Sequence, residues 1–507
     1  MRRKLVLRNL FVAGVGQIVT SLLGLIVRAV FVRTLGIEYL GVSGIFYNIM
    51  AILSLSELGI GIAIVYKLYE PIALEDVEKV KSYMAFFRKA YLVIGGVVLV
   101  LGLLLTPVVP YLAKDKINIP HIYLIYILFV LESAVSYVFS YKKSLIIANQ
   151  KKYIVDTYCN AGKVARAVLG ILFLIKTRNY IGFLAIQIIT GVLFDVLVNL
   201  RANKMFPYLR DRVHEPLSSE ASRDIREGTS AMLVHKVSTI IVKGTDNLLL
   251  SKIVGMAVAG IYANYAMISN AINGVLTMIF ASMTASIGNY TVVEEKENQR
   301  ALLEQLSFFE YWIVSFCAIS LAGLWNPFIR LWIGKKYVFA EPTVLMLALC
   351  FYVSGRRMVI LMFRDAMGLF RYDYKKAIGE AIGNLLISIV LGHFFGTIGI
   401  FAGTVITMVV ICLPIEPRVL YEKGFACSAL PYYGMYVLEL VVFLLLGGGT
   451  LEVVSLIQKT GIVGFIMKAG VCLVVPNIGM MLVWGKTKAF RSMLELGRRS
   501  KSDANVG

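Results

Sequence analysis

The segment Met232-Leu-Val-His-Lys-Val-Ser-Thr-Ile-Ile-Val-Lys-Gly-Thr-Asp-Asn247 is apolar enough to cross a membrane, yet it carries Lys236, Lys243 and Asp246. The two lysines are about two helical turns apart, so they lie near one stripe of a helix. Burying a lysine at membrane depth costs several kcal/mol unless it faces water or an anion. A purely structural ion pair between Lys243 and Asp246 is the alternative explanation. Whether these lysines bind an anion or only form structural ion pairs depends on whether other segments bring cations to a similar depth in the membrane.

The composition is that of an integral membrane protein. The chain has 507 residues, of which 58% are hydrophobic and only 16% are charged, and its net charge is +20. In a membrane protein such a surplus of basic residues belongs in cytoplasmic loops, where it sets the orientation and meets anionic lipid. The basic residues are dispersed over short loops, which argues against nucleic-acid binding. The six cysteines are scattered without a CxxC motif, so neither a disulfide framework nor a zinc site is predicted.

Runs of about twenty apolar residues, separated by short polar breaks, predict about fourteen membrane-spanning helices and no β-structure. The apolar run after Met1-Arg-Arg-Lys continues past Phe31 without a cleavage site, so we interpret it as the first span rather than a signal peptide. The predicted spans are 10–32, 40–66, 91–112, 121–147, 154–176, 180–200, 229–251, 257–287, 306–328, 342–363, 377–395, 398–420, 430–449 and 461–484.

The loops predict the orientation and the domain division. Alternate loops on one side hold about 33 lysines and arginines and those on the other about 10, so both termini are expected in the cytoplasm. A long basic loop separates six spans from eight. The predicted parts are an N-terminal lobe at 1–200, a linker at 201–228, a C-terminal lobe at 229–420, two further spans within 430–484 and a tail at 485–507.

A short motif indicates an internal repeat. Ser43-Gly-Ile-Phe-Tyr-Asn48 follows the first span and Ala259-Gly-Ile-Tyr-Ala-Asn264 follows the seventh, and Gly36 and Gly255 precede them at matching places. Glycines and aromatic residues are common at any membrane interface, so coincidence is the alternative. Six spans per unit is an even number, which predicts parallel repeats related by a pseudo-two-fold axis along the membrane normal.

Several spans place cations near mid-membrane. The in-span cations are Arg28, Lys163, Arg166, Lys236, Lys243, Arg356, Arg357 and Lys468, and the candidate in-span acids are Glu57, Glu132, Asp195, Asp246 and Glu380. Because the acids are fewer than the cations, structural ion pairs cannot account for every cation. This imbalance favours a water-filled, positively charged cavity that binds an anion. The predicted substrate-binding residues are Lys163, Arg166, Lys236, Lys243, Arg356, Arg357 and Arg28, although Arg28 is also placed to reach outward.

The chain carries no motif for chemistry of its own. It has no ATP-binding GxxxxGK[ST] loop and no HExxH motif, and its four histidines are dispersed. We therefore expect no enzymatic activity and no cofactor. Transport would draw on an H⁺ or Na⁺ gradient, on the membrane potential or on downhill use of the product. Asp246 and Glu57 are candidates for binding a coupling ion, and an ion pair with Lys243 is the alternative role for Asp246.

Several motifs of the chain resemble those of a known protein family. They are Leu35-Gly-Ile-Glu-Tyr-Leu-Gly-Val-Ser-Gly-Ile-Phe-Tyr-Asn48, Leu53-Ser-Leu-Ser-Glu-Leu-Gly-Ile-Gly61, His235-Lys-Val237, Gly244-Thr-Asp-Asn-Leu-Leu-Leu-Ser251 and Val258-Ala-Gly-Ile-Tyr-Ala-Asn-Tyr265. The likeness covers nearly the whole chain. The family is that of the polysaccharide transporters, or Wzx-type flippases, within the multidrug/oligosaccharidyl-lipid/polysaccharide superfamily.

This resemblance implies two six-helix lobes in a V, two additional C-terminal helices and transport by alternating access. It also implies a cationic cavity for an undecaprenyl-(pyro)phosphate-linked oligosaccharide in the bacterial cytoplasmic membrane, with membrane lipid around it. A polysaccharide polymerase and glycosyltransferases are possible partners. Three other functions stay open: a flippase for the peptidoglycan precursor, a MATE-type exporter of cationic drugs, and a non-transporting scaffold for polysaccharide synthesis.

Overall fold

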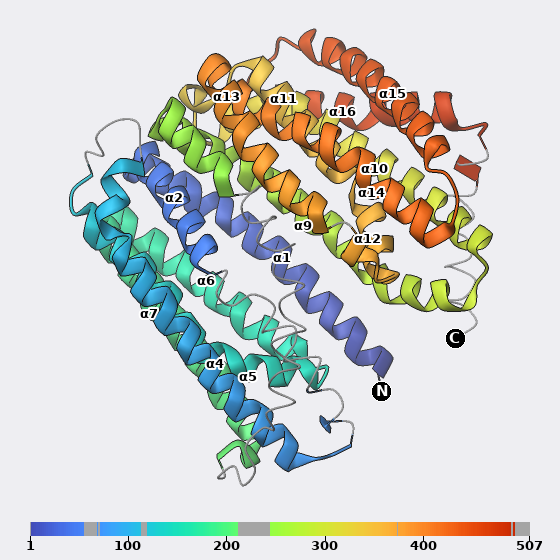
Figure 1. The fold of residues 1–507 in the computed structure, drawn as a ribbon. Helices are drawn as coiled ribbons and strands as arrows, with labels where there is room; N and C mark the ends of the chain where they lie inside the picture. The colour runs from blue at the N-terminus through green and yellow to red at the C-terminus, as the bar shows by residue number, and fades with distance from the viewer. Residues whose placement is uncertain are drawn as a thin grey trace. The chain divides into compact units, whose positions relative to one another are not determined.

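In the computed structural model the chain is built from α-helices with short 3-10 and π segments, and no strand occurs in the part that the structure describes (Figure 1). This confirms the prediction of an all-α membrane protein. The chain separates into two units, Met1–Gly260 and Ile261–Gly507. The structure describes residues 2–54, 68, 71–72, 74–112, 119–210, 244–372, 374–487 and 490–491.

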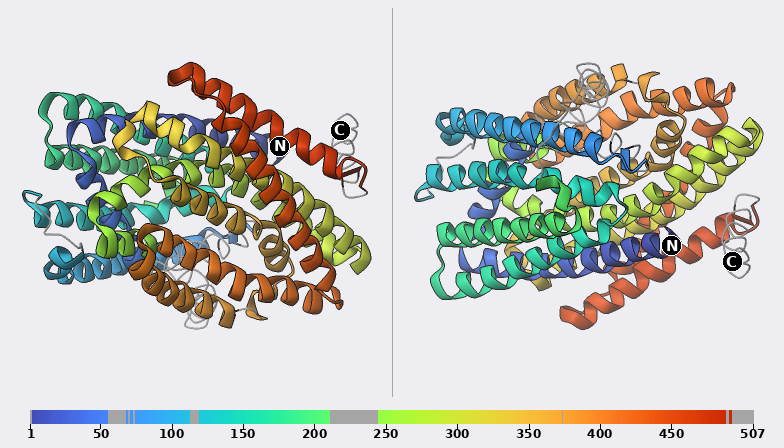
Figure 2. Two further views of the ribbon diagram at one scale, coloured as in Figure 1. Left: turned by 90° about the horizontal axis from the view of Figure 1, so that it is seen from above. Right: turned by 90° about the horizontal axis from the view of Figure 1, so that it is seen from below.

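The N-terminal unit is a bundle of long helices. Its helices are α1 (Arg2–Thr34), α2 (Ile37–Leu53), α4 (Val77–Leu104), α5 (Ile122–Ala148), α6 (Lys152–Thr177) and α7 (Tyr180–Met205). Helix α5 packs against both α4 and α7, and α6 packs against α1 and α7 (Figure 2). Short 3-10 segments at Thr106–Leu112 and Pro207–Arg210 follow α4 and α7, and a π segment at Leu250–Val254 precedes α9 (Met256–Val293).

Polar caps set the starts of two of these helices. The Asp76 side chain accepts a hydrogen bond from the backbone N–H of Lys79 at 2.9 Å at the start of α4. Asn179 accepts one from the N–H of Gly182 at 3.1 Å at the start of α7. Each cap satisfies a backbone donor that the first turn of a helix leaves without a partner. These contacts fix where the chain re-enters the bundle.

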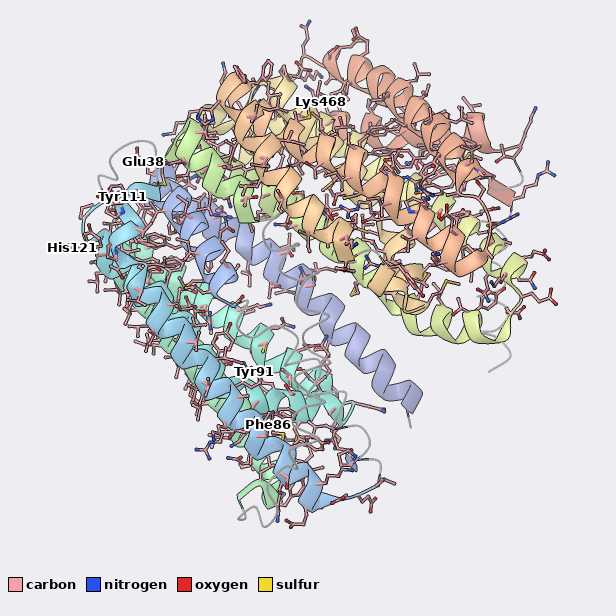
Figure 3. The ribbon with its side chains drawn as sticks, in the orientation of Figure 1. Glu38, Phe86, Tyr91, Tyr111, His121 and Lys468 are labelled. Atoms are coloured by element: carbon pink, nitrogen blue, oxygen red, sulfur yellow. The ribbon has the colours of Figure 1, made fainter. Side chains whose placement is uncertain are left out.

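The ends of the helices alternate as the predicted topology requires. Tyr111 and His121 belong to the connection between α4 and α5, and Glu38 is at the start of α2. All three lie at one end of the N-terminal unit, whereas Phe86 lies toward the other end (Figure 3). Lys252 Nζ donates a hydrogen bond to the backbone oxygen of Tyr111 at 2.9 Å, which places the start of α9 at that same end. Which end faces the cytoplasm stays a prediction from loop charge.

The starts of α2 and α9 make a reciprocal contact. A methyl group on Gly41 would collide with the backbone oxygen of Met256, and one on Gly260 would collide with that of Ile37. Ile37 and Met256 are the first residues of their helices, and each follows a glycine of positive φ, Gly36 (99°) or Gly255 (145°). Only glycine adopts such backbone readily.

This contact supports the internal repeat and changes its alignment. The sequence motif pairs Gly44 with Gly260, whereas the reciprocal contact makes Gly41 the counterpart of Gly260. Gly41 and Gly44 are three residues apart, which is close to one helical turn, so these two glycines fall near the same side of α2. Sequence similarity alone cannot separate two such alignments.

The C-terminal unit is organised around α10 (Lys296–Trp332), which packs against α11 (Glu341–Gly355), α15 (Leu430–Ser455) and α16 (Gly461–Trp484). The remaining helices are the rest of α9, α12 (Met358–Ala366), α13 (Tyr374–Thr407) and α14 (Leu413–Val419). Short 3-10 segments lie at Lys335–Tyr337 and Leu369–Tyr372, and π segments at Met408–Cys412 and Leu420–Phe425 flank α14.

Ten helices in the described part of the chain are long and apolar enough to cross a membrane. The chain is therefore a multi-pass membrane protein. The predicted span at 461–484 coincides with α16, and the predicted break near Gly396 is a residue of positive φ (60°) inside α13. The predicted span at 342–363 is interrupted, because α11 ends at Gly355 and α12 begins at Met358.

Three other predicted boundaries differ from the structure or fall outside it. Only the first part of the predicted span at 40–66 is described, as α2, and most of the span at 229–251 lies outside the described residues. The predicted linker at 201–228 begins too early, since α7 runs to Met205. The division of the chain into two lobes, two terminal spans and a tail stays a prediction.

Candidate functional site: charged side chains within the membrane helices

A cavity of about 270 Å³ lies within the N-terminal unit, between α2, α5, α6 and α7. Its walls combine aromatic, hydroxyl and charged side chains. The rings of Tyr47 and Phe129 form an edge-to-face pair with centroids 4.9 Å apart. The lining residues are Tyr47, Met50, Phe129, Glu132, Ser133, Val135, Ser136, Arg166, Ile188, Gly191, Val192 and Asp195.

Arg166 and Glu132 form an ion pair in this cavity, with Nη1 and Oε1 3.2 Å apart. Their side chains remain 32% and 24% exposed. The guanidinium lies against the backbone of Gly191, where a methyl group would collide with it. Arginine has five N–H donors and a single carboxylate does not engage all of them. Arg166 is therefore positioned to bind a further acceptor, such as a phosphate or a sugar hydroxyl, from within the cavity.

A second ion pair borders the cavity. Lys143 Nζ lies 2.6 Å from Asp195 Oδ1, and both side chains are largely buried. The neighbouring Lys142 donates a hydrogen bond to Asn203 at 2.8 Å. These contacts join α5 to α7, so they hold one wall of the cavity in place. The two ion pairs balance the charge of the cavity wall without filling its interior.

The other predicted residues of the N-terminal unit fall in different places. Lys163 is exposed on α6, one turn before Arg166, and Arg28 is partly buried on α1. Asp246 is buried, with 8% of its surface exposed. Lys236, Lys243 and Glu57 lie outside the described residues. Their predicted roles in binding substrate or a coupling ion therefore stay predictions.

The break between α11 and α12 carries Arg356 and Arg357, and the structure corrects what we expected of both. We expected unpaired cations facing a cavity. Instead, each guanidinium is bound by two carboxylates from other helices. The Arg356 side chain is only 1% exposed, so it is not available to a substrate in this structure. Arg166 is also paired, but it keeps access to a cavity.

Arg356 joins α10 to α15. Its Nη1 lies 3.1 Å from Glu310 Oε2, and it also donates to the backbone oxygen of Ser307 at 2.8 Å. Its Nη2 lies 2.5 Å from Glu439 Oε2. The guanidinium carbon is also 5.3 Å from the ring centre of Tyr311. Such aromatic faces stabilise a desolvated cation.

Arg357 joins α13 to α14 in a network with Lys376. Its Nη1 is 2.7 Å from Glu380 Oε1, and its Nη2 is 2.5 Å from Glu416 Oε1. Lys376 Nζ is 3.3 Å from Glu380 Oε2 and 2.6 Å from Glu416 Oε1. Two cations and two carboxylates make this network electrically balanced. Removing one member of such a buried network leaves another charge uncompensated, which is strongly destabilising.

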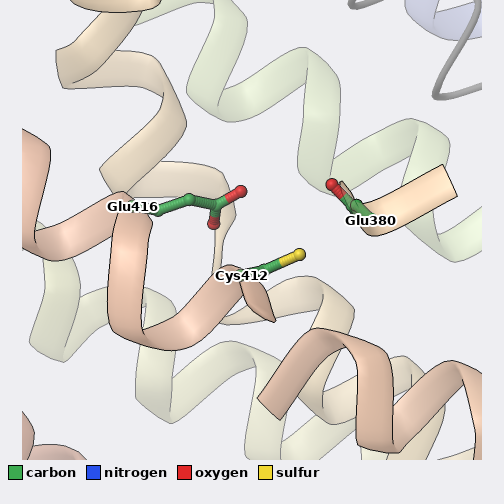
Figure 4. Close-up of side chains that lie close together, drawn as sticks. All are labelled: Glu380, Cys412 and Glu416. Atoms are coloured by element: carbon green, nitrogen blue, oxygen red, sulfur yellow. The ribbon is translucent and has the colours of Figure 1, made fainter. Parts of the chain in front are cut away.

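Glu380, Cys412 and Glu416 bring three potential metal ligands to within 4.8 Å of one another (Figure 4). Both carboxylates already accept hydrogen bonds from Arg357 and Lys376. A divalent cation here would have to displace two positive side chains. The donor set therefore fits an ion-pair network better than a metal centre.

A model of the polysaccharide biosynthesis protein family matches residues 6–284, more than half of the sequence. The chain belongs to this family. The match includes the whole N-terminal unit apart from its first residues, and with it the cavity that contains Arg166. No curated protein matches the sequence.

Solved structures show which fold this polysaccharide biosynthesis protein shares. A lipid II flippase, MurJ, in an inward closed conformation is 13% identical, with a TM-score of 0.70 over 94% of this chain and 99% of that one. An inward-facing multidrug resistance MATE family transporter of the MOP superfamily is 14% identical, with a TM-score of 0.65 over 80% and 96%. A MOP superfamily transporter from Pyrococcus furiosus has a TM-score of 0.58 at 14% identity, over 83% and 97%. The fold is thus the one that these flippases and transporters share.

Three acids of this polysaccharide biosynthesis protein were not predicted to lie near the arginines. Glu310, Glu416 and Glu439 all lie inside predicted spans, and all three bind Arg356 or Arg357. The prediction of unpaired cations is therefore wrong for Arg356 and Arg357. A complete count of acids within the predicted spans would have found these three residues. Which cation each one meets could not be predicted, because the partners come from different helices.

Proposed function

We propose that this protein is a flippase for undecaprenyl-(pyro)phosphate-linked oligosaccharide repeat units, acting in exopolysaccharide or capsule synthesis. It would move them across the bacterial cytoplasmic membrane by alternating access, with both termini in the cytoplasm. The observation that supports this proposal best is the cavity of the N-terminal unit, which Arg166 lines together with hydroxyl and aromatic side chains. The family assignment to polysaccharide biosynthesis supports the same class of substrate.

The lining of the cavity suits the polar head of such a lipid. Arg166 offers N–H donors to phosphate oxygens, while Ser133 and Ser136 exchange hydrogen bonds with sugar hydroxyls. Tyr47 is 58% exposed and presents an aromatic face on which a sugar ring packs. Lys163 adds an exposed cation one turn away on α6. Arg28, Lys236 and Lys243 remain candidate contributors, whereas Arg356 and Arg357 take a structural role.

Reconstitution in liposomes tests the proposal. Purified protein should move a fluorescent, undecaprenyl-pyrophosphate-linked oligosaccharide from one leaflet to the other, measured by enzymatic access to the sugar. Arg166→Ala should slow this movement by about tenfold or more, because a hydrogen bond to a charged group contributes about 1.5–3 kcal/mol. Lys176→Ala, which removes an exposed cation at the end of the same helix, is the matched control and should transport normally.

The result also separates the competing functions. Movement of lipid II but not of the oligosaccharide lipid would identify a peptidoglycan-precursor flippase, which the fold likeness to MurJ makes the second candidate. Export of a cationic drug would favour a MATE-type antiporter. No movement of any lipid by correctly folded protein would favour a scaffold for a polymerase and glycosyltransferases. Repeating the assay with an H⁺ gradient, a Na⁺ gradient or a membrane potential would reveal the coupling, for which Asp246 and Glu57 are our candidates.

A further inference from the structure

Arg356, Glu310 and Glu439 form a charged triad that is almost fully buried. The exposed fractions of their side chains are 1%, 1% and 4%. The triad joins three parts of the C-terminal unit: Glu310 is on α10, Arg356 is at the break after α11, and Glu439 is on α15. With all three groups ionised, the triad would carry one uncompensated negative charge in a membrane bundle. Such a charge is costly in a low-dielectric interior.

The two carboxylates bind opposite ends of the same guanidinium. Glu310 accepts from Nη1 and Glu439 accepts from Nη2. One guanidinium neutralises only one of them, and the second then feels the repulsion of the first. Carboxylates that share a site in this way hold a proton between them at a pH where an isolated carboxyl is ionised.

The hydrogen bonds of Glu310 favour its ionised form. Its Oε1 accepts from the backbone N–H of Val359 at 2.7 Å, in the first turn of α12, while its Oε2 accepts from Arg356. Both oxygens therefore face donors, and neither needs a proton. The positive end of α12 adds to the stabilisation of a negative charge at this position. Glu310 acts as the carboxylate cap of α12 and as the counter-ion of Arg356.

Glu439 is placed differently. Its Oε2 accepts the bond from Arg356, and no hydrogen bond to its Oε1 occurs among the described residues. A proton on that oxygen removes the excess charge and leaves the bond to Arg356 in place. From this charge balance and geometry, we propose that the triad binds one proton, carried by Glu439. The ligand of this site is thus H⁺ itself, and the proposal does not depend on which lipid the protein transports.

Among the described residues, no cation other than Arg356 pairs with the two carboxylates of the triad. The rings of Tyr311 on α10 and Tyr436 on α15 face the Arg356 guanidinium, at 5.3 and 5.7 Å from its carbon to their centroids. Tyr352 of α11 and Tyr432 of α15 are the other titratable groups near the triad, and both are neutral at physiological pH. The nearby Arg357 and Lys376 are already balanced by Glu380 and Glu416.

The bound proton has a structural consequence. Among the described residues, Glu439 provides the ion-pair contact between α15 and the α10–α12 part of the unit. Losing the proton would place two full negative charges around one guanidinium and weaken the packing of α15. This helix is one of the two predicted spans that lie outside the internal repeat. The site therefore makes the attachment of an accessory helix sensitive to proton binding.

Infrared spectroscopy of the full-length protein in lipid nanodiscs tests this directly. At neutral pH the wild type should show the carbonyl band of an unionised carboxylic acid that shifts on exchange into D₂O. Glu439→Gln should lose that band, because glutamine replaces the protonated acid with a neutral amide of the same shape. Glu452→Gln removes an exposed carboxylate from the same helix and should keep the band.

A second variant guards against misfolding of the first. Glu310→Gln leaves Arg356 with Glu439 alone, a neutral pair that needs no proton, so the same band should disappear although Glu439 is intact. Loss of the band in either folded variant supports a shared proton. A wild-type spectrum without such a band, or a band that persists in both glutamine variants, would overturn the proposal. Flipping by the wild type is measured separately, so this outcome does not decide the proposed transport function.

Discussion

Arg357 and Lys376 bind the same two carboxylates. Arg357 lies at the break before α12 and Lys376 is in the first turn of α13, yet both contact Glu380 and Glu416. The four side chains are 16%, 4%, 10% and 2% exposed, respectively, so protein rather than water surrounds most of their charge. This arrangement gives Arg357 a role in stability.

Arg357→Gln should destabilise the protein by about 3–5 kcal/mol, because it leaves two buried carboxylates with Lys376 alone. Thermal unfolding in detergent would measure the loss. Arg418→Gln is the control: its ion pair with Glu422 is 67% and 46% exposed, so its loss should cost at most about 1 kcal/mol. If Arg357→Gln unfolded like the wild type but failed to transport, substrate binding would be the better account of Arg357.

Gly191→Ala should impair transport while every charge is retained. Its new methyl group would collide with the Arg166 guanidinium and displace it from the cavity wall. We expect a loss of at least several-fold in the liposome assay, approaching that of Arg166→Ala. Gly96→Ala on α4 is the matched control, because no atom lies within 4 Å of its new methyl group. Equal activity of the two glycine variants would remove Arg166 from the binding site.

Gly41→Ala should loosen the contact between the starts of α2 and α9. The added methyl group meets the backbone oxygen of Met256, which cannot rotate away as a side chain can. Overpacking of this kind costs about 1–3 kcal/mol. Gly260→Ala should have a similar effect through Ile37. Thermal unfolding would show it, with Gly448→Ala as the control, since that position has nothing within 4 Å. Unchanged stability of both Gly41→Ala and Gly260→Ala would argue against the reciprocal contact.

Glu439→Gln should flatten the decline of stability at alkaline pH. If the folded protein holds a proton that the unfolded chain releases, the folded state binds more protons at neutral pH and above. The free energy of unfolding then falls as the pH rises through the range where the triad loses its proton. Glutamine cannot lose that proton, so the variant should keep its stability where the wild type declines. Parallel melting curves against pH for the two proteins would contradict this expectation.

Much of the fold was predictable because its signals are local. The span at 461–484 coincides with α16, and the predicted break near Gly396 is a residue of positive φ within α13. A bilayer requires each crossing helix to be apolar over about twenty consecutive residues, and that requirement is visible in any window of sequence. The interruption at Arg356 and Arg357 was not predicted, because the residues on both sides of it are equally apolar.

The site was predictable only in part. Arg166 was a predicted binding residue, and the structure places it in a cavity; Arg356 and Arg357 were predicted in the same way and are enclosed by carboxylates. All three are arginines in apolar helices, so their sequence contexts do not distinguish them. What separates them is the number of acids that neighbouring helices bring within reach.

The amino-acid sequence alone determined that this protein crosses the membrane many times and that cations lie within its helices. Hydrophobic runs and charged residues are properties of the chain whatever its tertiary contacts. Only the tertiary structure decided that Arg356 meets Glu310 and Glu439 while Arg166 stays open to a cavity. An ion pair forms only where opposite charges come within about 4 Å, and helix packing sets which distant residues come that close.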